Sequence, residues 1–157
     1  MKPTANNTLQ IAVEMERLGR TFYESLALGC GHAEIAALAT SLAKAEEEHI
    51  ETFVRMRNAL PPDQRGPKLA DNELFAATEV LHKKIIPSAK AVHKAVQAPD
   101  LLKVLDMAIE METRAVDFYS TLLYDVTGLD AAVMAEIVDE EKAHVRMLQE
   151  VRKLLPG

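Results

Sequence analysis

The stretch AVEMERLGRTFY, residues 12–23, returns almost unchanged as AIEMETRAVDFY, residues 108–119. The alanine, the Glu-Met-Glu triplet and the Phe-Tyr pair recur in register, 96 residues apart from residue 12 to residue 108. A second motif, Glu-x-x-His, occurs at 46–49 and again at 141–144, with an offset of 95 residues from 46 to 141. Two motifs that recur at almost one spacing predict a chain made of two related halves.

Helical periodicity runs through most of the chain and is divided by glycine and proline. The composition is rich in Ala, Leu, Glu, Lys and Met and only 4% aromatic, which favours helices. We expect long helices at roughly 8–28, 33–59, 99–126 and 129–154. About 40 residues of weaker helical pattern, divided by Pro87, lie between the second and the third, too many for a hairpin loop. The sequence therefore predicts an all-α fold, a four-helix bundle of two helix pairs joined by a long, partly helical crossover.

Composition and charge exclude several classes of function. The net charge of -6 and the lack of a basic cluster argue against a nucleic-acid partner. Cys30 is the only cysteine, which excludes an internal disulfide and a cysteine-ligated iron or zinc centre within these 157 residues. The sequence has no secretory h-region and no run of about 18 apolar residues, so we expect neither secretion by the usual signal nor a membrane partner. We expect one cytoplasmic domain over residues 1–157.

Acidic residues and histidines interrupt the apolar stripe of each predicted long helix. In the first and third helices, the i, i+3, i+4 progression places Glu16 and Glu112 on the core side. Glu14 and Glu110 lie two residues earlier, about 200° around the helix, and are expected to face solvent. In the other two helices, the interruptions are the two Glu-x-x-His motifs. The core-facing set is Glu16, Glu46, His49, Glu112, Glu141 and His144.

Four core-facing carboxylates need a source of positive charge. An isolated buried carboxylate is very costly, and several together repel one another or take up protons. No Lys or Arg shares these stripes at the same level, whereas two divalent ions would bring four positive charges. Glu and His one turn apart on one helix face can bind one site. Oxygen-rich ligation with one imidazole per metal suits iron or manganese better than structural zinc. We therefore predict that these six residues are metal ligands.

Two tyrosines recur with the repeat and follow the core glutamates on the same helix face. Tyr23 lies seven residues after Glu16, and Tyr119 lies seven residues after Glu112. Two roles fit this position. The tyrosines can be ordinary core residues, or they can support the metals through a hydrogen bond to a ligand carboxylate.

With these motifs, the chain resembles the rubrerythrin branch of the ferritin-like di-iron carboxylate proteins over all four long helices. The shared pattern is one Glu from each of two helices plus Glu-x-x-His from each of the other two. The resemblance implies a ferritin-like bundle, two iron ions and redox chemistry with hydrogen peroxide or dioxygen. It also implies that Glu46 and Glu141 bridge the metals, whereas Glu16 and Glu112 each chelate one.

The sequence departs from rubrerythrins proper in two respects. Those proteins carry a cysteine-ligated rubredoxin module that supplies electrons, and these 157 residues contain none, so we expect an external electron-donor protein. They also typically have a further Glu one turn after the third-helix ligand, where this chain has Ala115. The missing carboxylate puts a rubrerythrin-like peroxidase activity in doubt.

Three hypotheses for function follow. The first is a di-iron oxidoreductase that reacts with hydrogen peroxide or dioxygen, with manganese or a mixed pair as alternative metals. The second is a ferroxidase-type protein that binds, stores or delivers iron. The third is a metal-stabilised bundle that acts through interaction with a partner. We also expect a homodimer.

Overall fold

The fold is all-α, as predicted, in a computed structural model that describes residues 4–84, 86–87, 90–91, 93–94 and 101–156. The helices are α1 Ala5–Gly29, α2 Ala33–Asn58, α3 Pro62–Arg65, α4 Asp71–Lys84, α6 Leu101–Asp125 and α7 Ala131–Leu154. The four long helices agree with the predicted ranges to within three residues at the ends that can be compared. The predicted start of the third helix at Pro99 and Asp100 lies outside the described residues.

Side chains that bind the free backbone N–H groups fix where the long helices begin. The hydroxyl of Thr4 accepts from the Asn7 N–H at 3.1 Å at the start of α1. Nδ1 of His32 accepts from the Ile35 N–H at 3.4 Å at the start of α2. Asp130 caps α7 in the same way. The tight connection from α6 to α7 includes Gly128 at a φ of 93°, a conformation that favours glycine.

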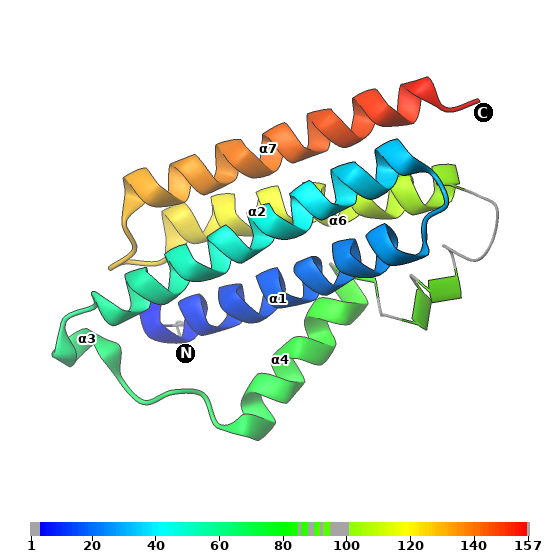
Figure 1. Cartoon of the computed structure of the whole chain (residues 1–157). Helices are drawn as coiled ribbons and strands as arrows, with labels where there is room; N and C mark the ends of the chain where they lie inside the picture. Colours follow the sequence, from blue (N-terminus) through cyan, green and yellow to red (C-terminus); the bar gives the residue numbers. More distant parts are fainter. Residues whose placement is uncertain (1–3, 85, 88–89, 92, 95–100, 157) are drawn as a thin grey trace.

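The four long helices form two hairpins, α1 with α2 and α6 with α7, whose members lie against each other along their length. The two hairpins approach each other less closely and are joined mainly through side chains. Between α2 and α6, the chain runs through α3 and α4, and α4 lies beside α1 outside the four-helix bundle (Figure 1). Hydrogen bonds from Asn6 to the carbonyls of Gly66 and Pro67, and from the Leu69 N–H to Gln10, fasten the crossover to α1.

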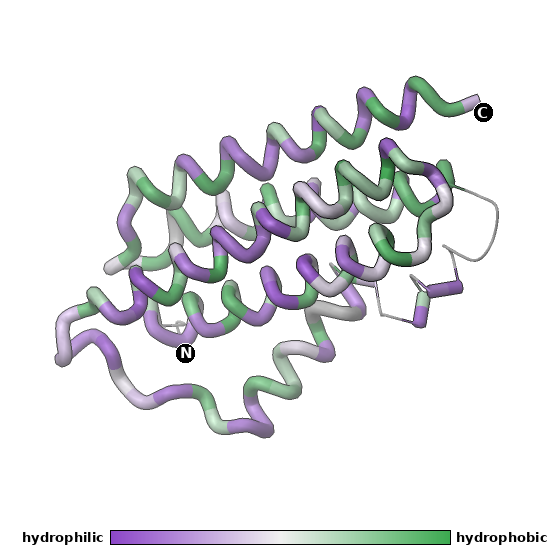
Figure 2. The backbone as a smooth tube through the Cα atoms, viewed as in Figure 1, coloured by the Kyte–Doolittle hydropathy of each residue, from purple (hydrophilic) through white to green (hydrophobic). Residues whose placement is uncertain are grey.

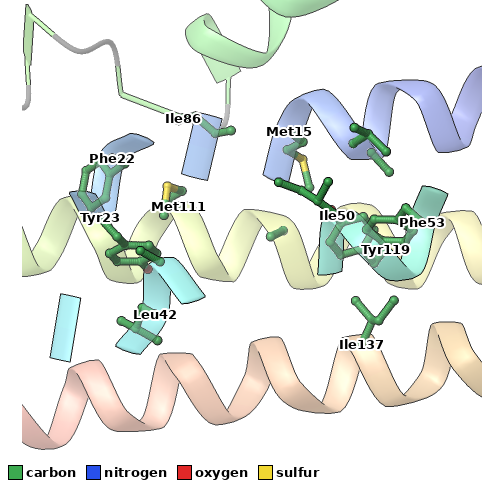
Figure 3. Close-up of a cluster of buried hydrophobic side chains, with 14 of the residues drawn as sticks. Met15, Phe22, Tyr23, Leu42, Ile50, Phe53, Ile86, Met111, Tyr119 and Ile137 are labelled. Carbon is green, nitrogen blue, oxygen red and sulfur yellow. The ribbon is translucent and has the colours of Figure 1, made fainter. Parts of the chain in front are cut away.

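The core is a continuous set of apolar side chains contributed by all four long helices and by Ile86 of the crossover. Figure 2 shows hydrophobic and hydrophilic residues alternating along each long helix, as expected for helices with one buried face. Figure 3 shows part of this core, including Phe53, Tyr119 and Ile137. No helix in the described part of the chain is both long and apolar enough to cross a membrane.

Candidate metal centre

Midway along the bundle, the apolar core is interrupted by the six residues that the sequence predicted to be metal ligands. Each has at most 6% of its surface exposed. They form two groups, and within each group one ligand atom per residue lies within 4.8 Å of every other. The groups are Glu16, Glu46, His49 and Glu141, and Glu46, Glu112, Glu141 and His144. Glu46 and Glu141 belong to both groups, so the two potential sites share a pair of carboxylates.

The two histidines approach the carboxylates in equivalent ways. Nδ1 of His49 lies 3.0 Å from Glu141 Oε1 and 3.5 Å from Glu16 Oε1. Nδ1 of His144 lies 3.2 Å from Glu141 Oε2 and 3.5 Å from Glu112 Oε1. The ring centroids are 6.1 Å apart, with 27° between the planes. Each imidazole therefore presents Nδ1 to Glu141 and to the glutamate of its own half.

Without metal, the histidines carry part of the charge that balances the carboxylates. Burial alone would lower the pKa of His49, but the nearby carboxylates of Glu141 and Glu16 outweigh burial and raise it to about 12. Burial is likewise outweighed at His144, where Glu112 and Glu141 raise the pKa to about 10. Burial, and then the charge of Glu141, raises the pKa of Glu112 to about 8. Burial would also raise the pKa of Glu141, yet the adjacent Glu112 and both imidazoles lower it. In the metal-free centre, both imidazoles therefore favour the protonated form, and Glu112 binds a proton more readily than Glu141 does.

The two tyrosines donate to carboxylates of the centre. The hydroxyl of Tyr23 lies 2.6 Å from Glu112 Oε1, and that of Tyr119 lies 2.6 Å from Glu16 Oε1. Burial, followed by the adjacent carboxylate, raises the pKa of each tyrosine well above its ordinary value, so both stay protonated and donate. Of the two readings open from the sequence, the hydrogen bond to a core glutamate is the one observed.

Unpartnered buried atoms test whether a metal would fit. Glu16 Oε2, Glu141 Oε1 and His49 Nδ1 are buried and make no well-aligned hydrogen bond to any described residue. Buried polar atoms in folded proteins nearly always have partners, and a divalent cation among these three would supply one. Four carboxylates with two imidazoles are a donor set that suits iron or manganese. The residues therefore fit a pair of metal ions.

A small cavity of about 10 Å³ adjoins the carboxylates. Its volume is close to the minimum needed to hold one water molecule. Figure 3 shows three apolar side chains of its wall, Met15, Met111 and Ile86. The rest of the wall consists of Glu16, Gly19, Glu46, Glu112, Ala115 and Glu141. Ala115, at the position of the additional rubrerythrin carboxylate, thus lies directly beside the centre.

Gly19 makes room for Glu46. A Cβ at Gly19 would lie 3.2 Å from Glu46 Oε2, closer than most van der Waals contacts. The repeat-related position 96 residues later is Ala115, so the two halves differ here. Nothing in the helical periodicity of the sequence indicates this contact with a carboxylate on the neighbouring helix.

Glu14 and Glu110 point away from the centre, as the helix register predicted. Glu14 is partly exposed and pairs with Arg17 at 2.6 Å, whereas Glu110 is exposed and pairs with Arg114. Only one glutamate of each Glu-Met-Glu triplet therefore takes part in the buried cluster.

Glu140 is a contact of the centre that the sequence did not predict. Its Oε2 lies 2.5 Å from Nε2 of His49, on the side of the ring opposite Nδ1. Glu140 stands in the charged run DEEKAH, residues 139–144, and 58% of its side chain is exposed. Since its repeat-related residue is Ala45, the duplication could not have indicated it either.

Comparisons with known proteins bear on the family and the fold of the chain. The rubrerythrin family model matches residues 7–152. A crystal structure from Thermotoga maritima, of a protein described as a ferritin-like diiron-carboxylate protein, is similar with a TM-score of 0.70 and 25% identity. The match covers 98% of this chain and 97% of that one, which confirms the ferritin-like fold. No curated protein matches the chain significantly. Because the family model spans nearly the whole sequence, this chain belongs to the rubrerythrin family.

Proposed function

We propose that the six buried residues bind two iron ions and that the protein is an oxidoreductase that reduces hydrogen peroxide or dioxygen with electrons from an external donor. The observation that carries the proposal is the pair of ligand groups that share Glu46 and Glu141. A single metal site would need only one group. Two interlocked groups are the arrangement expected for two adjacent ions that react together.

Each residue has a distinct part in this proposal. Glu46 and Glu141 span the two positions, whereas Glu16 and Glu112 each belong to one. His49 and His144 supply one imidazole to each position through Nδ1. The hydroxyls of the two tyrosines hold the unshared glutamates in place, one on each side.

The cavity beside the carboxylates has room for a small oxidant. Reduction of one hydrogen peroxide to two waters takes two protons and two electrons, and two Fe(II) ions held by the six residues would supply the electrons by becoming Fe(III). A cavity of about 10 Å³ has room for about one water molecule, and Ile86 of the crossover forms part of its wall. Dioxygen and hydrogen peroxide are close to water in size, so the cavity suits them better than a large organic substrate.

Anaerobic reconstitution tests the proposal. Protein loaded with Fe(II) and then desalted should retain two iron ions per chain. Glu46→Ala and Glu141→Ala should each lower occupancy at both positions, while Glu14→Ala serves as the matched control and should lower neither. Hydrogen peroxide or dioxygen should then produce the near-ultraviolet absorbance of Fe(III), and a reductant should abolish it with the iron still bound.

The other outcomes separate the alternatives. Iron that leaves the protein or accumulates beyond two per chain after oxidation would favour the storage or delivery hypothesis. Bound metal that undergoes no redox change with either oxidant would favour a structural, partner-binding role. A wild-type protein that holds no iron after desalting would contradict the proposed centre itself.

A further inference from the structure

The two metal positions differ in how their histidines are held. In His49, both ring nitrogens contact a carboxylate of α7, and the two carboxylates are neighbours in the sequence. Nδ1 lies 3.0 Å from Glu141 Oε1, and Nε2 lies 2.5 Å from Glu140 Oε2. The imidazole is therefore clamped between the centre on one side and an outer glutamate on the other.

His144 has no equivalent clamp. The residue of α2 that corresponds to Glu140 is Ala45, 95 residues earlier, and a methyl group accepts no hydrogen bond. In the part of the chain that the structure describes, the polar contacts of His144 are made by Nδ1, to Glu141 and Glu112. The internal repeat thus gives both halves the same buried ligands, but among the described residues only His49 has a carboxylate in contact with Nε2.

A carboxylate behind a metal-binding histidine has two effects. Because it accepts a hydrogen bond from Nε2–H, it keeps the proton on that nitrogen and leaves the lone pair of Nδ1 for the metal. It also makes the imidazole a stronger donor and fixes the orientation of the ring. Loss of such a partner typically costs 10- to 100-fold in metal affinity. Since 58% of the Glu140 side chain is exposed, we expect the lower end of that range here.

We propose that Glu140 is a positioning residue that makes the group of Glu16, Glu46, His49 and Glu141 the tighter of the two metal positions. This inference rests on the proposed dinuclear centre. The position next to His49 fills first, and the position next to His144 fills at a metal concentration about tenfold higher. The protein therefore passes through a state with one metal bound on a defined side.

Stepwise metal titration of a set of matched variants tests the inference. Anaerobic protein is titrated with Co(II), whose visible absorbance reports each binding step, in competition with a chelator. Wild type should bind in two distinguishable steps. Glu140→Ala should weaken the first step about tenfold and leave the second unchanged, so that the two steps merge. Glu140→Gln keeps an oxygen acceptor, so its first-step affinity should lie between those of wild type and Glu140→Ala. Glu48→Ala removes one exposed charge next to His49, where no side-chain contact of Glu48 with the ring is present, and should change neither step.

The internal repeat provides a converse variant. Ala45→Glu places a carboxylate where Glu140 stands in the other half, and it should tighten the second step toward the first. In Zn(II)-loaded protein, the Nε2–H proton of His49 should give a downfield NMR signal that exchanges slowly with water in wild type and rapidly in Glu140→Ala. A merely structural role for Glu140 would not move that signal.

The contrary results are distinct. Equal affinities for both steps in wild type, or equal weakening by Glu140→Ala and Glu48→Ala, would overturn the role of Glu140 while leaving the dinuclear centre standing. Absence of any tight Co(II) binding by wild type would instead contradict the proposed centre.

Discussion

Tyr23 on α1 donates a hydrogen bond of 2.6 Å to Glu112 on α6, so a residue of the first half holds a carboxylate of the second. The relation is reciprocal, because Tyr119 on α6 donates to Glu16 on α1 at the same distance. These two bonds join the hairpins, together with the contacts of His49 with Glu140 and Glu141 and the apolar side chains of the core. Each tyrosine thus helps to hold the two hairpins together and fixes the position of a glutamate in the proposed centre.

The crossing of these bonds predicts which metal position each tyrosine affects. Tyr23→Phe should lower metal occupancy beside Glu112, and Tyr119→Phe should lower it beside Glu16. Each substitution thus affects the metal position next to the glutamate of the other half of the chain. Anomalous diffraction from metal-loaded crystals gives the occupancy of each position. Each variant should also lose about 1–3 kcal/mol of metal-free stability, because a buried acceptor loses its donor. Each substitution is the control for the other, and loss on the same half as the substituted tyrosine would contradict this crossed arrangement.

The sequence could predict the fold and the buried cluster because both leave a periodic signal. A glutamate in an apolar stripe is visible at a spacing of three and four residues, and the duplication made each motif testable against its copy. Contacts between helices leave no such signal. The partner of Tyr23, the space beside Gly19 and the contact of Glu140 with His49 depend on how the hairpins are placed. The register of a single helix does not contain that information.

The sequence also left the charge balance of the metal-free centre incomplete. The stripes contain no Lys or Arg, and metal was the only neutralising charge considered. In the structure, His49 and His144 face the carboxylates through Nδ1 and hold protons there. A histidine near a glutamate in sequence can be a neutral ligand or a cation, and the register of one helix does not show which carboxylates its ring will meet.

One glutamate of each Glu-Met-Glu triplet is buried and the other points to solvent, and this difference gives a second prediction. Glu16→Ala and Glu112→Ala should each lower metal content, since both side chains lie in the buried groups. Glu14→Ala and Glu110→Ala remove only ion pairs with Arg17 and Arg114 at the surface, which contribute about 0–1 kcal/mol. Metal analysis after desalting should therefore show loss in the first pair alone. Equal loss in both pairs would mean that the assigned helix faces are wrong.

Gly19 gives a third prediction, in which stability and metal binding change in opposite directions. Gly19→Ala should favour the helix by up to about 1 kcal/mol, because alanine is the better helix former. Its Cβ would lie 3.2 Å from Glu46 Oε2, so the carboxylate shared by both groups must shift. We expect about a tenfold loss of metal affinity with metal-free melting unchanged or higher. Gly31→Ala, where a Cβ meets no atom within 4 Å, is the control. Unchanged affinity in Gly19→Ala would show that the carboxylate adapts freely.

The last prediction concerns pH and follows from three raised pKa values. Glu112 has a pKa of about 8 against an ordinary value of 4.5, and His49 and His144 have values of about 12 and 10 against 6.5. Each group binds its proton more tightly in the folded than in the unfolded chain. Its contribution to stability is therefore fully present below the ordinary pKa and is lost as pH rises through the folded pKa.

Metal-free protein should accordingly lose stability between about pH 5 and pH 8 through Glu112, and from about pH 6.5 upward through the imidazoles. Metal must displace the same protons, so its binding releases protons and tightens as pH rises. Both effects enlarge the rise in melting temperature that Mn(II) produces, which should be greater at pH 8 than at pH 6. Thermal unfolding with and without Mn(II) at pH 6 and at pH 8 measures this rise in melting temperature. An indicator dye in a weakly buffered sample detects the released protons.

The control is a double variant, Glu46→Ala with Glu141→Ala, whose melting temperature should not depend on Mn(II) at either pH. If wild type gained as much from Mn(II) at pH 6 as at pH 8, without proton release, the imidazoles and Glu112 would not be protonated in the metal-free centre.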